Sequence, residues 1–359
     1  MRGSTLSQRK LTIEPYFRQP RFLLRWPVVR SWAGRSMRRR DFIKVIGGAA
    51  VAWPFAARAQ EPGRIYRLGV LHQLPRTAAQ FARLFDGLRR QGFIEGRNLV
   101  VDASGFGSSA QQYQERVAGM VQSGANVIFA GGDAAMRAAQ EVARGVPIIG
   151  IADDMVGSGL AASLSRPDGN ATGFSILANE LDGKRQELLM ELVPDTRRMA
   201  ALVDPTTKSP VQLGELVGAA RSRGIEVSTH SASKMEEIGP AVDAAYASGA
   251  SVLNVLASVV LNSNRRIIFE RTAELRMPAI YQFPESAEQG GFAGYGPRLE
   301  EIYQQIATPV ARLLRGEHPR DIPVQQPTTF ELVINLKTAK AIGRVIPETF
   351  LIRADKVIE

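Results

Sequence analysis

Short apolar runs alternate with helical patterns along most of the chain, beginning at Ile65. This alternation is typical of βα units built around a parallel sheet. The runs that we expect to form strands are Tyr66–His72, Leu99–Asp102, Val127–Ala130, Pro147–Ile151, Met199–Val203, Ile225–Thr229, Val252–Leu256 and Pro278–Tyr281. Because the pattern occurs twice, the sequence predicts an α/β fold with two similar open parallel-sheet lobes joined by a hinge.

Two pairs of short segments favour an internal duplication. Ser123–Ile128 returns almost unchanged as Ser248–Leu253, a shift of 125 residues (248 minus 123). The expected helix ends Arg89–Gly92 and Arg221–Gly224 correspond at a shift of 132 residues (221 minus 89). Helix ends commonly use arginine and glycine, so chance is the alternative for either match. We interpret the matches as two copies of one α/β unit.

Open parallel sheets bind ligands beyond the carboxyl ends of their strands. If two such edges face each other, the ligand lies between them and the cleft closes by hinge bending. Glycine and proline interrupt the pattern at two expected crossovers, and an extended stretch is a candidate for the third: Gly173–Ala178, Tyr295–Pro297 and Thr328–Leu336. The predicted lobes are residues 64–174 plus 297–328 and residues 175–296 plus 329–359.

Loops at the predicted strand ends supply the candidate ligand-binding residues. They are His72, Gln73, Gly132, Asp133, Ala134, Asp153 and Asp154 in the first lobe, and Asp204, Thr206, Ser258, Gln282, Phe283 and Tyr295 in the second. A carboxylate at Asp153 or Asp154 accepts hydrogen bonds from a ligand ammonium or hydroxyl, unless it belongs to a solvated loop or a salt bridge. Asp133 either caps the next helix or points into the cleft. Phe283 either stacks on a flat ligand or closes the core.

The N-terminal region predicts export. Arg39 and Arg40 begin the run Arg39–Lys44, which has the form of a twin-arginine signal. The apolar stretch that follows is about 13 residues long, whereas a membrane-spanning helix needs about 20. We therefore expect a cleaved signal peptide over residues 37–59, with cleavage after Ala59 and a periplasmic mature protein. The alternative is a buried helix that follows arginines by chance. We interpret residues 1–36 as an extension upstream of the true start at Met37.

The positive charge of the chain is confined to its N-terminal region. The whole chain carries +10, but Lys and Arg minus Asp and Glu gives 13 minus 2, or +11, for residues 1–59, and 32 minus 33, or −1, for residues 60–359. Nucleic-acid binding needs clustered basic groups on the folded part, so we expect none. The absence of cysteine excludes disulfides, thiolate metal sites and a lipid-modified N-terminal cysteine. The mature form is predicted to be a soluble monomer.

Enzyme motifs are weak in this sequence. Gly105–Ala110 matches GxGxxA, but it follows the second expected strand, and no acidic residue ends the next strand to hold a ribose. The three histidines, His72, His230 and His318, lack the spacing of a metal motif. Gly157–Gly159 lacks a complete GxSxG elbow. We therefore predict no catalytic residues, no cofactor and no metal site.

Several motifs together resemble one protein family. Arg166–Gly173, Lys184–Pro194, Tyr295–Pro297 and above all Gln326–Lys340 resemble the ABC transporter substrate-binding proteins related to the tryptophan-binding transport component. The likeness covers residues 64–359. It implies a type I periplasmic-binding fold that holds a small solute, such as an amino acid or another small organic molecule, and delivers it to a permease and an ATPase subunit. The alternatives are an exported sensor that signals to a membrane receptor and an exported hydrolase.

The sequence departs from this family after the third expected strand. The family commonly shows Gly-Thr-Pro-Ala there, whereas this chain has Gly131, Gly132, Asp133 and Ala134. If Asp133 points into the cleft, it places negative charge where the carboxylate of an amino acid would otherwise meet amide groups.

Overall fold

The computed structural model describes residues 63–359. The predicted export signal, with Arg39, Arg40 and the cleavage site after Ala59, lies outside the described residues, as do the proposed start at Met37 and residues 1–36.

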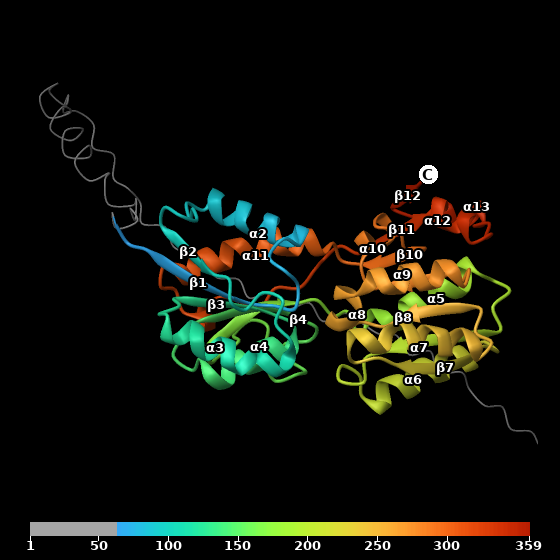
Figure 1. The fold of residues 1–359 in the computed structure, drawn as a ribbon, viewed down its shortest axis with the longest axis horizontal. Helices are drawn as coiled ribbons and strands as arrows, with labels where there is room; N and C mark the ends of the chain where they lie inside the picture. Colours follow the sequence, from blue (N-terminus) through green and yellow to red (C-terminus); the bar gives the residue numbers. More distant parts are fainter. Residues whose placement is uncertain (1–62) are drawn as a thin grey trace, which may run out of the picture. The chain divides into compact units, whose positions relative to one another are not determined.

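A five-stranded parallel sheet with the strand order β2-β1-β3-β4-β5 forms the first half of the described chain. Its strands are β1 (Tyr66–Leu71), β2 (Leu99–Asp102), β3 (Val127–Gly131), β4 (Ile148–Ala152) and β5 (Ala171–Ser175). Its helices are α2 (Ala79–Arg90), η1 (Ala110–Gln112), α3 (Tyr113–Gln122), α4 (Asp133–Val142) and, from late in the chain, α11 (Leu299–Leu314). The helices α2 and α11 pack side by side on one face, and α3 and α4 cover the other (Figure 1).

A seven-stranded sheet with the order β12-β11-β10-β9-β8-β6-β7 forms the second half. Its strands are β6 (Arg198–Val203), β7 (Glu226–Ser231), β8 (Val252–Val255), β9 (Ala279–Tyr281), β10 (Ala293–Gly296), β11 (Glu331–Asn335) and β12 (Lys356–Ile358). The associated helices are α5 (Leu181–Leu192), α6 (Pro210–Arg221), α7 (Met235–Ala247), α8 (Val259–Ser263), α9 (Arg265–Glu274), α10 (Pro284–Glu288), α12 (Leu336–Ala341) and α13 (Glu348–Leu351), whereas the short helix η2 (Pro319–Asp321) lies beside β5 of the first sheet. The strands are parallel except where β10 meets β11.

The two halves repeat one topology. The order β7-β6-β8-β9-β10 reproduces β2-β1-β3-β4-β5, with β11 and β12 added at one edge. The matched sequence segments also match in conformation: Gly124 and Gly249 both follow a helix with positive φ (77° and 83°), as do Gly92 and Gly224 (88° and 75°). Glycine tolerates this conformation without the strain of a Cβ atom. The predicted α/β fold with two similar, mostly parallel sheets is confirmed.

The chain passes between the sheets at places slightly different from those predicted. Gly173 lies inside β5, and Tyr295 and Gly296 lie inside β10, so the crossovers follow these strands. A Cβ atom at Gly173 would be 1.9 Å from the carbonyl oxygen of Gly150, and one at Gly296 would be 2.2 Å from that of Gln282. These glycines allow close packing within the sheets and do not interrupt the strands. The residue boundaries of the two lobes stay a prediction.

The third predicted crossover, Thr328–Leu336, is mostly strand. Its central part is β11, which pairs antiparallel to β10. The crossing segment precedes it, and there Gln325 pairs with β5: its backbone N–H donates to Gly173 O, and its carbonyl accepts from Ser175 N, both at 2.8 Å. The strands β5, β10 and β12 were not among the predicted strands.

Candidate ligand-binding site

The loop after β3 brings the first sheet against an element of the second. Gly132 precedes α4 with φ 97° and ψ 158°, and its N–H donates to Ile151 O at 2.7 Å. This conformation is open essentially only to glycine. A Cβ atom at Gly132 would lie 2.9 Å from Cγ2 of Val259, in α8 beside the second sheet. Glycine at this position therefore allows the strand-end loops of the two sheets to touch.

Two carboxylates lie together at the carboxyl edge of the first sheet. Asp133 is the first residue of α4, and its Oδ2 accepts a hydrogen bond from Asp153 N at 3.1 Å. Gly132 is the N-cap, so the expected capping role of Asp133 is wrong. Oδ1 of Asp153 accepts from the backbone N–H of Asn179 at 2.8 Å. Burial raises the pKa of Asp133 and raises that of Asp153 to about 6.

Four predicted residues converge at the carboxyl edge of the second sheet. Asp204 follows β6, and its Oδ2 accepts from Ser258 Oγ at 2.8 Å, while its Oδ1 accepts from Thr206 Oγ1 at 2.7 Å. Gln282 follows β9, and it donates to Ser258 O at 3.0 Å and accepts from Ser258 N at 3.2 Å. These bonds fix the three loops that follow β6, β8 and β9 relative to one another. Contact of these residues with a ligand stays a prediction.

A buried ion cluster lies beside these loops. Asp182, in the first turn of α5, accepts hydrogen bonds from Arg185 and from Lys208, one on each carboxylate oxygen. Its Oδ1 also accepts from Ala257 N at 3.0 Å. The side chains of Arg185 and Lys208 are 0 % and 3 % exposed, so the pairing replaces the solvation that these cations lose. Burial lowers the pKa of Lys208, and the neighbouring Asp182 opposes this shift.

This cluster connects to the first sheet through Asn179. Asn179 lies in the crossing segment between β5 and α5; its N–H bonds to Asp153, and its side-chain oxygen accepts from Lys208. Sequence reasoning did not select Asn179, Asp182, Arg185 or Lys208. The one signal in the sequence is the spacing of Asp182 and Arg185, three residues apart on a helix, which allows an ion pair. Lys208 follows two threonines in a polar loop, and its burial has no sequence signal.

His72 is integrated into the core of the first half. Its Nδ1 accepts from Leu74 N at 2.9 Å, so Nε2 carries the proton and donates to the Tyr303 hydroxyl at 2.8 Å. A Cβ atom at Gly131 would overlap the imidazole ring, at 1.9 Å from Cδ2. Burial lowers the pKa of His72 to about 4, which keeps the ring neutral. Both ring nitrogens therefore have protein partners.

The other predicted residues have varied surroundings. Gln73 is half-buried, and Ala134 is exposed. Asp154 accepts from the N–H groups of Val156 and Gly157 in its own turn, at 3.1 and 2.9 Å. Phe283 is 4 % exposed and packs in the core that also contains α2 and α11. Tyr295 is half-buried, and its carbonyl accepts from Arg185 at 3.3 Å.

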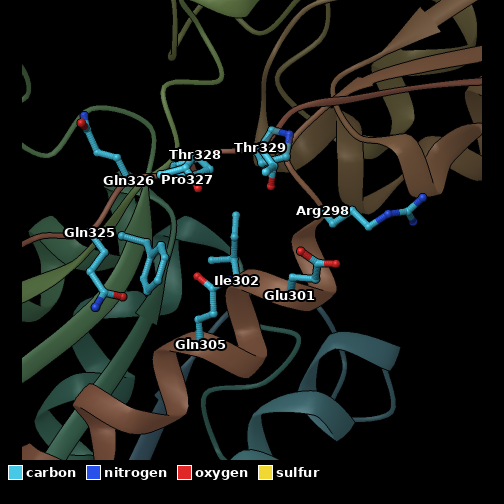
Figure 2. A pocket seen from close by; sticks show the side chains of 11 residues that line it. Arg298, Glu301, Ile302, Gln305, Gln325, Gln326, Pro327, Thr328 and Thr329 are labelled. Carbon is cyan, nitrogen blue, oxygen red and sulfur yellow. The ribbon is translucent and has the colours of Figure 1, made fainter. Parts of the chain in front are cut away.

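A cavity of about 330 Å³ lies elsewhere, among the crossing segments. Figure 2 shows Ile302 and Gln305 of α11 extending toward the segment Gln325–Thr329, while Arg298 points away. Arg298 forms ion pairs with Glu288 at 3.1 Å and with Glu331 at 2.7 Å. None of the lining residues belongs to the predicted ligand-binding set. The cavity and the strand-end loops are therefore separate candidates for the place where a ligand binds.

Residues 63–359 show neither a clustered metal site nor a membrane-spanning helix. This part of the chain contains no group of three or more His, Asp or Glu side chains arranged to hold a metal ion. No helix within the same residues has the length and apolar character needed to cross a bilayer.

Two α/β halves of equal strand order, with polar loops meeting at their strand ends, define a protein of the type I periplasmic-binding fold. The sequence identifies the family within this fold class. The family model described as ABC transporter substrate binding protein matches residues 74–358, and the chain belongs to this family.

The chain is similar to one protein in sequence and to two solved structures in fold. A tyrosine-binding protein of Clostridioides difficile (strain R20291) is 26% identical over 257 residues, which cover 71% of this chain and 74% of the relative. A conserved domain protein from Vibrio cholerae superposes with a TM-score of 0.72 at 25% identity, covering 82% of this chain and 99% of the other. A Streptococcus pneumonia protein in complex with L-Trp gives a TM-score of 0.69 at 23% identity, covering 82% and 100%.

Proposed function

We propose that this protein captures one small solute between the strand-end loops of its two sheets and delivers it to the permease and ATPase subunits of an ABC importer. The observation that carries the proposal is the contact between the two carboxyl edges. Gly132 meets Val259 there, and Asn179 connects Asp153 to Lys208. Ligands of open α/β sheets bind at such edges.

The proposed site combines residues from both halves. The first half contributes Gly132, Asp133 and Asp153, and the second contributes Asp204, Ser258 and Gln282. A ligand that contacts both sets favours the closed arrangement by the free energy of its additional contacts. The relatives named for tyrosine and L-Trp support an amino acid or a similar small organic molecule as the solute.

The cellular setting is part of the same proposal. The family membership supports a place outside the cytoplasm, and Arg39 and Arg40 support export by the twin-arginine route. We propose a periplasmic monomer with no catalytic role. Neither the family nor the relatives favour the alternative of a signalling sensor. Turnover of any solute that stabilises the protein would contradict the non-catalytic proposal.

A thermal-shift screen of amino acids, sugars and aromatic acids tests this function. A solute at 100 times its dissociation constant adds about 2.7 kcal/mol to the free energy of unfolding. We expect at least one solute to raise the melting temperature, and isothermal titration to give one site per chain. If no solute in a broad screen raises the melting temperature, the proposed function is wrong.

A further inference from the structure

Carboxylates outnumber cations where the two sheet edges meet. Three cationic side chains accompany Asp133, Asp153, Asp182 and Asp204. Arg185 and Lys208 both bond to Asp182, and the charge of Arg137 in α4 acts on Asp133 from beyond ion-pair distance. Within residues 63–359, no Lys, Arg or His nitrogen lies within 4.0 Å of the carboxylate of Asp133 or Asp153. The carboxylates of Asp133 and Asp153 therefore have no direct ion-pair partner, and the charges of Arg137 and Lys208 act on them only from a greater distance.

The carboxylates of Asp133 and Asp153 are more accessible to solvent than the ion cluster of Asp182, Arg185 and Lys208. Asp133 and Asp153 are partly exposed, whereas the side chains of Asp182, Arg185 and Lys208 are at least nine-tenths buried. Asp153 Oδ2 has no hydrogen-bond donor in the described part of the chain, and its Oδ1 accepts only from a backbone N–H. The acceptor oxygen of Asp153 is therefore available to a donor on a ligand.

The first turn of α4 already carries an anionic side chain. The Asp133 carboxylate belongs to the first turn of α4 and accepts a hydrogen bond from the backbone N–H of Asp153 at 3.1 Å. Helix N-termini attract anions through their unpaired N–H groups and the helix dipole. In this chain Asp133 takes that place, so the carboxylate of an incoming ligand would meet a like charge.

We propose that the site selects solutes that carry a cationic amine with N–H donors, bound between Asp133 and Asp153, and that a carboxylate on the solute is not required. This inference rests on the proposed function, because it names the chemical class of the solute for the same site. An ammonium group supplies both the missing charge and the missing donors. Tyrosine and tryptophan, named for two relatives, contain such an amine.

A matched ligand series tests the inference on the full chain by isothermal titration. The series contains tyramine (amine only), tyrosine (amine and carboxylate) and 3-(4-hydroxyphenyl)propionate (carboxylate only), with putrescine as an aliphatic amine and tetramethylammonium as a cation without N–H. We expect an amine with N–H groups to bind at least about tenfold more tightly than the matched acid or tetramethylammonium. Neither the acid nor tetramethylammonium has an ammonium N–H that can donate a hydrogen bond to the carboxylates of Asp133 and Asp153. Removal of the carboxylate should weaken binding by less than about tenfold.

Variants separate the role of the carboxylate from general effects. Asp153→Asn keeps the size of the side chain and should weaken amine binding by about tenfold or more, while the melting temperature of the free protein shows that it folds. Asp195→Asn, at an exposed position, is the matched control and should bind like wild type.

The outcomes distinguish this inference from the proposed function. If the acid binds as tightly as the amine, or if Asp153→Asn binds the amine unchanged, the inference is overturned. If no amine binds but a solute without an amine raises the melting temperature in the broad screen, the inference fails and the proposed function stands. If no solute of any class binds, both fail.

Discussion

Removal of the Asp182 carboxylate should destabilise the fold more than most single substitutions. Asp182→Ala leaves Arg185 and Lys208 as buried cations without their shared partner, and it leaves the Ala257 N–H without its acceptor. Loss of one partner from a buried ion pair costs about 3–5 kcal/mol, because the remaining charge is neither solvated nor paired. We expect the free energy of unfolding to fall by an amount in this range.

Urea denaturation followed by circular dichroism measures this loss. The control is Glu226→Ala, which removes an ion pair with Arg198 whose two side chains are 76 % and 58 % exposed. Exposed pairs contribute about 0.2–1 kcal/mol, so the control should unfold near the wild-type midpoint. An Asp182→Ala variant within about 1 kcal/mol of wild type would show that the cluster is solvated, and the reasoning from buried charge would be refuted.

Two further predictions concern Gly132 and His72. Gly132→Ala should destabilise the protein by about 1–3 kcal/mol and weaken solute binding, because the φ of 97° at this position suits glycine and a Cβ atom would press on Val259. The control is Gly145→Ala, whose added Cβ atom would meet no atom within 4 Å. Equal urea midpoints for the two variants would contradict this prediction. The pKa of His72 is about 4 in the folded protein and about 6.5 in the unfolded protein. Between these pH values the unfolded state therefore binds more protons than the folded state. The free energy of unfolding should fall by up to about 3 kcal/mol as the pH drops from 6.5 to 4. His72→Gln should reduce this dependence in urea titrations at several pH values, and an unchanged dependence would exclude His72 as its source.

The strands of the two sheets could largely be predicted because buried parallel strands must be apolar on both faces. β3 and β4 are buried along their whole length, and their sequences are correspondingly apolar or glycine. Helix ends at Gly92 and Gly224 were readable for a related reason, since their positive φ favours glycine whatever surrounds it.

The parts that were missed depend on neighbours distant in sequence. Gly173 looked like an interruption, but it is required by the carbonyl of Gly150 on the adjacent strand. The sequence analysis did not select Lys208, and only the folded chain brings it to Asp182 and Asn179. His72 follows a predicted strand as a ligand-contacting residue would, yet its partner Tyr303 is 231 residues away.

The predicted site residues therefore fall into two groups. Asp133 and Asp153 are partly exposed in hydrogen-bonded loops at the strand ends of the first sheet. Asp204, Ser258 and Gln282 are buried, as are His72 and Phe283, and side-chain burial of this kind depends on packing that the sequence pattern does not specify.

A crystal structure with a solute found by the thermal-shift screen tests the central claim most directly. We predict that the solute lies between the strand-end loops, in contact with Asp133 or Asp153 on one side and with Ser258 or Gln282 on the other. A solute bound instead in the cavity beside Gln325–Thr329, or in contact with the loops of one sheet alone, would contradict the account.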